Sequence, residues 1–266
     1  MRRLLIVVAL VFTHTAWSGD FEDGVAAYKQ KDYANAIAKF RSAAEQGSAA
    51  AQYNLATMYD KGEGVAQDYK EALRWFHLAA QQGDSDAQFN LGIMYRDGQG
   101  VAQDYKEAVR WYSLAAEQGN AAAQYNLGFM YHNGQGVKQD YRNAARWYRL
   151  AAQQGLALAQ VNLGFMYSNG QGVIQDYKEA VRWYHLAAQQ GQTEAQFNLG
   201  GMYGNGKGVP QDYVRAHMWS NIAAVTGDKD SIKNRDSVAS KMSPQQVEQA
   251  QRMARECMAS NFKKCD

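Results

Sequence analysis

Few side chains in this sequence have the types and spacing that catalysis requires. The histidines beyond residue 18 are His77, His132, His185 and His217. They stand on separate segments without metal-ligand spacing. Neither G-x-S-x-G nor H-E-x-x-H occurs, and the one S-x-x-K match, Ser260 to Lys263, has no partner motif and is interpreted as chance. We therefore expect no catalytic residue, no metal site and no cofactor.

The amino terminus has the pattern of a secretory signal peptide. A basic start precedes an apolar run over residues 4–12, and Ala16 and Ser18 are the small residues that a signal peptidase accepts. The run is about half of the ~20 apolar residues that span a bilayer. We expect residues 1–18 to be removed, a periplasmic or secreted location, and no stable membrane span afterwards. An uncleaved anchor or a buried helix is the alternative.

Charge balance argues against two classes of partner. The chain has 28 basic and 26 acidic residues, and two of the basic residues lie in the predicted signal peptide. A nucleic-acid binder needs a basic surface that displaces counterions from phosphates. Binding to a lipid surface has a similar requirement. We therefore expect neither nucleic acid nor a lipid surface as a partner.

Internal repetition is the strongest signal in the sequence. Tryptophan, tyrosine and glycine each recur at intervals of 36 residues, starting from Trp75, Tyr59 and Gly47. Such registers are the signature of a solenoid, in which each unit buries its apolar face against the next. The repeats divide 51–230 into five units, which are 51–86, 87–122, 123–158, 159–194 and 195–230. Residues 19–50 and 231–266 differ from them and are predicted to form capping segments.

The first half of a unit predicts a helix that ends at a glycine. Ala51, Leu55, Met58 and Tyr59 share one helical face. Gly62 follows them, and glycine tolerates the left-handed conformation of a helix carboxyl cap. The G-x-G strings that come next join two helices, so we do not interpret them as phosphate loops, which follow a strand.

The second half of a unit predicts another helix. Asp68 is a suitable N-cap, and Glu71 three residues later would complete a capping box. Gly83 ends this helix. The apolar stripe consists of Tyr69, Ala72, Leu73, Phe76, Ala79 and Ala80. Because a single helical hairpin cannot bury such a stripe, neighbouring units must stack.

These units resemble the Sel1-like repeat, a relative of the tetratricopeptide repeat. The resemblance is carried by strings such as AQFNLGIMYRDGQGVAQDYKEAVRWYSLAAEQG over 87–119 and its counterpart over 123–155. It implies an all-α fold, a right-handed superhelix of antiparallel helix pairs whose first helices line a concave surface. It also implies an adaptor role in signalling or envelope assembly, often after export.

The two ends depart from the repeat. Residues 19–50 lack four loop residues of the standard unit, which predicts a tetratricopeptide-like hairpin with a tight turn. After Gly227 the repeat pattern stops, and Ser243-Pro244 predicts the start of a closing helix. We expect this helix to turn inward Val247, Ala250, Ala254, Cys257 and Met258.

Cys257 and Cys265 are the only cysteines. In an oxidising compartment they can pair, provided that Asn261 ends the helix and lets the tail turn back. We predict a disulfide, with two free thiols as the alternative.

Helical geometry predicts a partner-binding groove on the face of the first helices opposite Leu55 and Tyr59. Its residues are Tyr53, Thr57 and Asp60; Phe89, Ile93 and Arg96; Tyr125, Phe129 and His132; Val161, Phe165 and Ser168; and Phe197. Aromatic residues dominate the first two positions, which favours docking of a peptide or helix. The alternative is that the rings at position 53 and its equivalents pack only against other repeats.

An asparagine accompanies this row in every unit. The series is Asn54, Asn90, Asn126, Asn162 and Asn198. These amides could contact a ligand, but hydrogen bonds between neighbouring repeats are the favoured interpretation. The same holds for Gln52 and its equivalents.

Together these features predict an exported, monomeric scaffold that binds a protein or peptide partner and is not an enzyme. The alternative is an exported hydrolase or a binder of β-lactam or peptidoglycan. A β-lactam or peptidoglycan assay, with Ser260 substituted, would separate the two.

Overall fold

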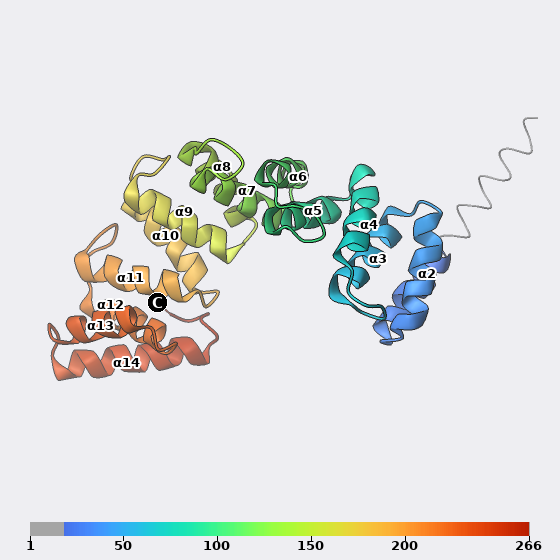
Figure 1. Ribbon diagram of the computed structural model, residues 1–266. Coiled ribbons are helices and arrows are strands. Elements are labelled where there is room, and N and C mark those ends of the chain that lie inside the picture. The colour runs from blue at the N-terminus through green and yellow to red at the C-terminus, as the bar shows by residue number, and fades with distance from the viewer. Residues whose placement is uncertain (1–18, 266) are drawn as a thin grey trace, which may run out of the picture. The chain divides into compact units, whose positions relative to one another are not determined.

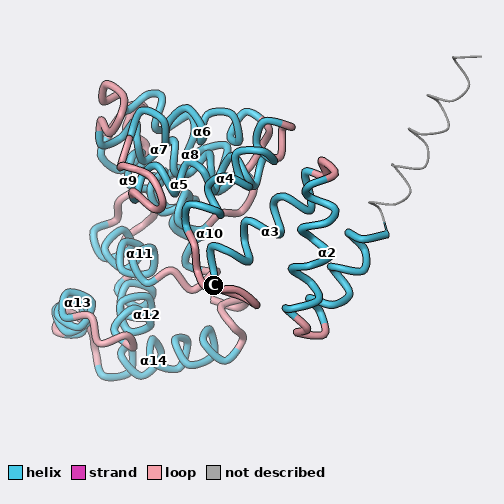
Figure 2. Tube along the Cα trace, turned by 45° about the vertical axis from the view of Figure 1, so that its right-hand side comes forward, coloured by secondary structure: helices cyan, strands magenta, loops and turns pink. Residues whose placement is uncertain are grey.

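The computed structural model describes residues 19–265, and these residues form helices joined by turns and loops, without a strand (Figures 1 and 2). Residues 19–29 are helical. The following helices are α2 (Tyr33–Glu45), α3 (Ala49–Lys61), α4 (Tyr69–Gln81), α5 (Ser85–Asp97), α6 (Tyr105–Glu117), α7 (Ala121–Asn133), α8 (Tyr141–Gln153), α9 (Ala157–Asn169), α10 (Tyr177–Ala188), α11 (Thr193–Asn205), α12 (Tyr213–Ala224), α13 (Lys229–Ala239) and α14 (Pro244–Ala259). The predicted all-α architecture of repeated hairpins is confirmed. The predicted signal peptide, 1–18, lies outside the described residues.

The chain forms two compact units. The first contains the residues up to Leu127 together with Gln135–Lys138, and the second contains Gly128–Gly134 together with the residues from Gln139 onward. Each unit has its own buried core. In the first, Leu55 and Met58 of α3 pack with Trp75 and Phe76 of α4.

Helix ends follow the local chemistry of the repeat. Gly62 caps α3 in the left-handed region, with φ 71°, and donates its backbone N–H to Met58 O. Asp68 caps α4 by accepting bonds from the backbone N–H groups of Lys70 and Glu71 at 2.9 and 3.1 Å. The prediction that Glu71 completes a capping box is wrong, because the Glu71 carboxylate instead accepts a bond from Arg74 Nη1 at 3.1 Å.

The second glycine of each G-x-G string holds a loop against the preceding repeat. Gly100 has φ +69°, and a Cβ on it would lie 2.6 Å from the carbonyl carbon of Tyr69. Gly98 also has positive φ, but a Cβ there would meet nothing closer than 3.4 Å. The G-x-G pattern therefore serves chain reversal at one glycine and close packing of backbones at the other.

Buried glutamines join neighbouring repeats, as favoured from the sequence. Gln88 of α5 donates its Nε2 to Ala80 O at the end of α4, at 3.2 Å. Its Oε1 accepts a bond from Gln118 Nε2, beyond the end of α6, at 2.8 Å. Gln52 makes the same pair of bonds, to Ala44 O and from Gln82. Gln52 of α3 and Gln88 of α5 thus each link two successive second helices, and Gln160 of α9 makes the equivalent bonds to Ala152 O and from Gln190.

The amino-terminal hairpin has the expected tight turn. Lys31 adopts φ 62°, and Asp32 caps α2 by accepting a bond from the Asn35 N–H at 3.2 Å. Phe21 and Phe40 pack together, with ring centroids 5.9 Å apart. Both rings belong to the core of the first unit, so this short hairpin closes that core at its amino-terminal end.

The carboxyl-terminal region contains a helix that was not predicted from the sequence. Residues after Gly227 form α13, capped by Asp228, which accepts a bond from Ser231 N at 2.7 Å. The α13 helix packs against α12 and α11. The predicted capping segment 231–266 thus contains this helix in addition to the closing helix expected from Ser243-Pro244. The unit boundary predicted at residue 230 falls inside α13.

The closing helix α14 begins as expected. Ser243 and Gln246 form a reciprocal capping box, with Pro244 in the first turn. This helix packs on α12 and buries Ala250, Ala254 and Cys257. The other two residues expected to face inward, Val247 and Met258, are half-buried.

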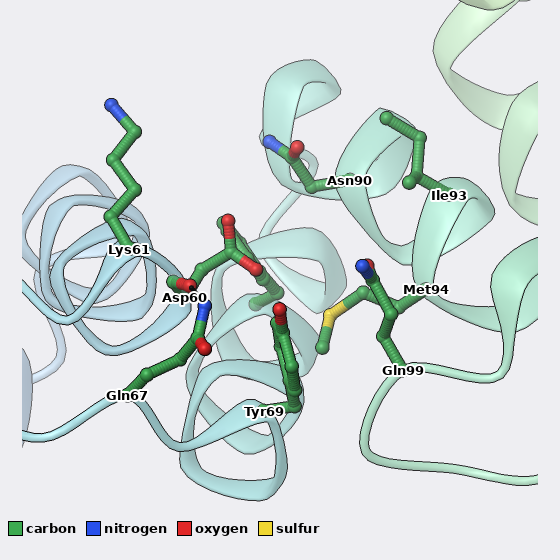
Figure 3. Close-up of a pocket in the computed structure, with 9 residues that line it drawn as sticks. Asp60, Lys61, Gln67, Tyr69, Asn90, Ile93, Met94 and Gln99 are labelled. Carbon is green, nitrogen blue, oxygen red and sulfur yellow. Dashed lines mark hydrogen bonds between the residues drawn. The ribbon is translucent and has the colours of Figure 1, made fainter.

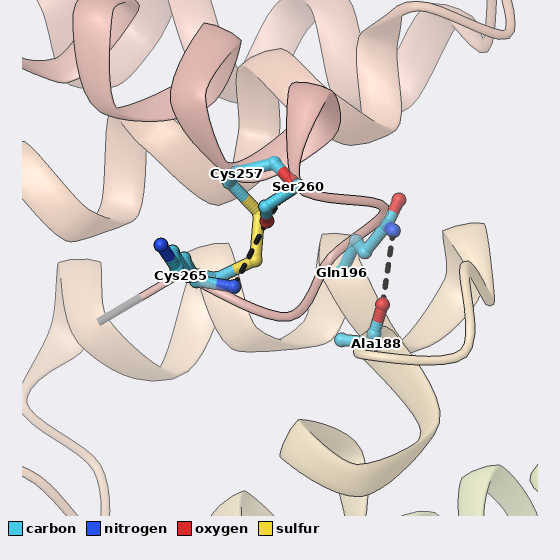
Figure 4. The surroundings of a disulfide bond; sticks show 6 residues. Ala188, Gln196, Cys257, Ser260 and Cys265 are labelled. Atoms are coloured by element: carbon cyan, nitrogen blue, oxygen red, sulfur yellow. Dashed lines mark hydrogen bonds between the residues drawn. A yellow bond between two sulfur atoms is a disulfide. The ribbon is translucent and has the colours of Figure 1, made fainter.

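The tail turns back after α14 and brings its cysteine to the helix (Figure 4). Asn261 and Phe262 have φ 54° and 62°. A disulfide joins Cys257 to Cys265, with the Cα atoms 4.6 Å apart. Phe262 lies against Gly191, in the turn between α10 and α11. The tail is thereby attached to the second unit at two points.

Candidate functional site

The first-helix row, which comprises the predicted groove residues, divides by exposure. Tyr53 packs on Phe76 of its own hairpin, with ring centroids 5.8 Å apart, and Phe89 packs on Tyr112 at 6.0 Å. Their rings are half-buried, so packing within the repeats explains why an aromatic residue recurs at this position. Val161 is only 3% exposed and belongs to the second core, so its expected place in a groove is wrong.

The exposed part of the row lies at the middle position of two helices in the second unit. Phe129 of α7 and Phe165 of α9 are each 40% exposed. Leu158 of α9 is 47% exposed and stands seven residues before Phe165, so the two share a helical face. Leu158 was not among the predicted groove residues. Its signal was an apolar residue where Asp86 and Glu194 stand in other repeats.

The last position of the row changes most in chemistry. Its four named members are Asp60, Arg96, His132 and Ser168. The Arg96 guanidinium donates to the Asp97 carboxylate at 2.7 and 2.8 Å and to Asn126 Oδ1 at 3.0 Å. The His132 ring packs edge-on against Tyr141, and burial lowers its pKa. The Ser168 hydroxyl donates to Phe165 O at 2.9 Å.

The asparagine series bonds to the preceding repeat at Asn90 and Asn126, but with different partners, so the regular ladder expected between repeats is not formed. Nδ2 of Asn54, Asn90 and Asn126 donates to the backbone carbonyl four residues earlier in the same helix, at 2.7, 2.9 and 2.9 Å. Asn126 also accepts a bond from Arg96 of the preceding repeat, and the Asn90 amide hydrogen-bonds with the Tyr53 side chain of the preceding repeat. Asn162 and Asn198 are half-buried at the equivalent position. An amide oxygen at this position is therefore able to face a ligand.

A pocket of about 410 Å³ opens beside Asp60 in the first unit (Figure 3). Its lining residues are Asp60, Lys61, Gln67, Tyr69, Phe76, Asn90, Ile93, Met94 and Gln99. In Figure 3 the Asp60 side chain and the Tyr69 hydroxyl turn toward the open centre, whereas the Lys61 side chain points away. Gln67 is held by a 2.6 Å bond from its Nε2 to Asp60 O. Burial raises the pKa of the Asp60 carboxyl, and the nearby Lys61 charge opposes that shift.

A second pocket, also about 410 Å³, lies in the second unit between α11 and α13. Phe197 of the first-helix row lines it together with acidic side chains of both helices, among them Glu194 and Asp230. The missed helix α13 thus builds one wall of a cavity at the end of the row.

The remaining reactive side chains have structural contacts. Ser260 Oγ donates to Cys257 O at 2.7 Å and accepts a bond from Lys264 N at 2.9 Å, which supports the tail. His77 Nε2 lies 3.2 Å from the Tyr95 hydroxyl. In residues 19–265 no group of three His, Cys, Asp or Glu side chains is placed to hold a metal ion. No helix in that range has the length and apolar character to cross a membrane.

The chain matches a family model and solved structures along most of its length. The model of the Sel1 repeat matches residues 21–48, 49–84, 85–120, 121–156, 157–192 and 193–224. The first match falls on the hairpin predicted to be tetratricopeptide-like. A comparison with curated proteins found no match.

Two solved structures share the fold and more than a third of their aligned residues with this chain. One is a protective antigen of uropathogenic Escherichia coli with an SLR fold, at 36% identity and a TM-score of 0.82, covering 92% of this chain. This chain spans 55% of that protein's length. The other is a Sel1 repeat protein from Oxalobacter formigenes, at 36% identity and a TM-score of 0.74, covering 82% of this chain and 87% of that one. The chain therefore belongs to the Sel1 repeat family.

Proposed function

We propose that this Sel1-repeat scaffold is exported and binds a protein or peptide partner along the first-helix row. Sel1 repeats generally form non-catalytic scaffolds that mediate protein interactions. The observation that carries the proposal is the exposure of Phe129, Phe165 and Leu158 in the second unit. Aromatic side chains contribute large contact area at a low cost in conformational entropy, so they are favoured anchors of protein interfaces.

Export is supported by two features at opposite ends of the chain. Residues 4–12 form the apolar run of the predicted signal peptide. The Cys257–Cys265 disulfide is the kind of bond that persists in oxidising compartments. The proposal places the protein in the bacterial periplasm or outside the cell, and the mass of the protein recovered there should lack residues 1–18.

The test removes two exposed rings without touching the cores. We expect the Phe129→Ala, Phe165→Ala double variant to lose most capture of a crosslinked partner from an envelope extract. The matched control is Leu186→Ala with Val225→Ala, because these side chains are 37% and 68% exposed in the same unit but lie off the row. Both variants should remain helical and unfold cooperatively. Equal capture by the two variants would remove the first-helix row from consideration.

A further inference from the structure

The pocket beside Asp60 contains a carboxylate without a counter-ion. Among the described residues no hydrogen bond or ion pair reaches the Asp60 carboxylate, although its side chain is partly removed from solvent. Unpaired carboxylates in such surroundings are costly, because burial disfavours the charged form. A cation supplied from outside the chain would offset that cost. The nearby Lys61 charge offsets part of it, but the Lys61 side chain points away from the pocket and forms no ion pair with Asp60 (Figure 3).

The next repeat shows what fills the equivalent space. Arg96 stands 36 residues after Asp60, and Asn126 stands 36 residues after Asn90. There the Arg96 guanidinium reaches across to Asn126 Oδ1 at 3.0 Å and is paired with the adjacent Asp97 carboxylate. The chain therefore contains, one repeat along, a guanidinium held by an amide oxygen and a carboxylate.

In the first repeat Asn90 has the place of Asn126, but Asp60 stands in the place of Arg96 and Lys61 in that of Asp97. Asn90 uses its Nδ2 to bond Asp86 O, and its amide also hydrogen-bonds with Tyr53 of the preceding repeat. Because an amide oxygen has two lone pairs, Asn90 Oδ1 can still accept a bond at the pocket that it lines. Asp60 supplies the carboxylate, now from the position that Arg96 occupies. Tyr69 and Phe76 add aromatic rings to the lining. A carboxylate, an amide oxygen and aromatic rings are the groups that hold a planar guanidinium.

We propose that this pocket binds an arginine side chain presented by the partner, with its guanidinium paired to the Asp60 carboxylate and Asn90 Oδ1. The volume of about 410 Å³ lies within the range of small-ligand sites, about 300–1,000 Å³, and accommodates one long side chain. The inference rests on the proposed function, because the arginine belongs to the docked partner. Lysine fits less well, because its compact ammonium lacks the fork that engages a carboxylate with two parallel bonds.

The experiment uses three peptides and does not require the partner. Acetylated and amidated Gly-Arg-Gly is titrated into the isotopically labelled protein and followed by amide chemical shifts. The matched peptides contain citrulline, which has nearly the same shape without the charge, or lysine. We expect the arginine peptide to shift the resonances of Asp60, Asn90 and Gln99. The citrulline peptide should bind about tenfold more weakly, the effect expected for loss of one charge-assisted interaction.

Variants locate the interaction. Asp60→Asn should weaken the arginine peptide about tenfold, whereas the control Glu117→Gln, which removes an exposed carboxylate from the same unit, should leave it unchanged. The double change Asp60→Arg, Lys61→Asp copies the Arg96–Asp97 pair into the first repeat. It should fold normally and bind no arginine peptide, because its own guanidinium occupies the pocket.

Equal binding of arginine and citrulline peptides would overturn the inference, as would full retention of binding in Asp60→Asn. Shifts confined to other parts of the chain would do the same. These outcomes are separable from the test of the proposed function. If the Phe129 and Phe165 substitutions abolish partner capture while no arginine peptide binds, the scaffold role stands and only the arginine site fails.

Discussion

The two glycines of a G-x-G string should respond differently to the same substitution. Gly98 and Gly100 have nearly equal φ values, +72° and +69°, so an alanine at either must adopt the left-handed region. Only at Gly100 would the added Cβ enter the backbone of the preceding repeat, at 2.6 Å from the carbonyl carbon of Tyr69. The pair therefore separates the cost of backbone conformation from the cost of a lost contact between repeats.

The magnitudes follow from these two terms. The left-handed conformation costs an L-residue about 1–2 kcal/mol, and restriction of the unfolded chain offsets up to about 1 kcal/mol. We expect Gly98→Ala to lower the free energy of unfolding by about 1 kcal/mol. Gly100→Ala adds overpacking of about 1–3 kcal/mol. Because Tyr69 begins α4, its backbone cannot move without disturbing that helix, so a total of about 2–4 kcal/mol is expected.

Urea denaturation followed by far-ultraviolet circular dichroism measures both variants. Because the Gly100 contact joins two repeats, its loss should also broaden the transition, as the coupling between neighbouring hairpins weakens. Gly170→Ala and Gly172→Ala repeat the comparison in the second unit, where Gly172 faces Tyr141. Equal destabilisation by the two members of a pair would refute the assignment of separate roles.

Two further predictions concern buried polar groups. A double-mutant cycle of Gln88→Leu and Gln118→Leu should give a coupling energy of about 0.5–1.5 kcal/mol, the net contribution of one hydrogen bond, and a value near zero would contradict the glutamine link. Burial lowers the pKa of His77 and His217 below the ordinary 6.5, so the folded state binds protons less readily than the unfolded state. The contribution of these histidines to the free energy of unfolding should be fully present above pH 6.5 and should be lost as the pH falls below 6.5. In urea series across this range, His217→Gln should flatten the fall, and an unchanged pH dependence would count against its burial as the cause.

Most of the fold could be predicted because its determinants are local and repeated. Asp68 as an N-cap and Gly62 as a C-cap are visible in the sequence, since a cap depends on residues within one turn. The Glu71 side chain was assigned wrongly because two partners lie within its reach, the N-cap backbone and Arg74, and spacing does not choose between them. Helix α13 was missed because most of its residues are polar or charged and it has no apolar stripe, since only Ser231 and Val238 are buried.

The residues of the first-helix row were harder to assign, because periodicity shows which residues share a helical face but not how deeply each side chain is buried. Val161 and Phe165 lie on neighbouring turns of α9, yet one is buried and the other is 40% exposed. The difference depends on the second-helix side chains packed beside each position. Those side chains belong to another element, so spacing within α9 alone could not predict it.

The two amide series show how repetition should be interpreted in such a chain. Gln88 and Asn90 recur equally well, but the glutamine makes the same link at successive repeats, whereas the contacts of the asparagine with the preceding repeat differ between Asn90 and Asn126. Its additional methylene lets it reach from the interior of α5 to two second helices, whereas the shorter asparagine bonds its own helix. A second recurring residue, represented by Gln118, accompanies the glutamine, while no recurring partner accompanies the asparagine. Two residues that recur together, as Gln88 and Gln118 do, therefore indicate a contact that holds neighbouring repeats together. A recurring residue whose neighbour changes from repeat to repeat indicates a position that determines which ligand is bound. Asn90 lines a pocket with Asp60, whereas the equivalent Asn126 accepts a bond from Arg96.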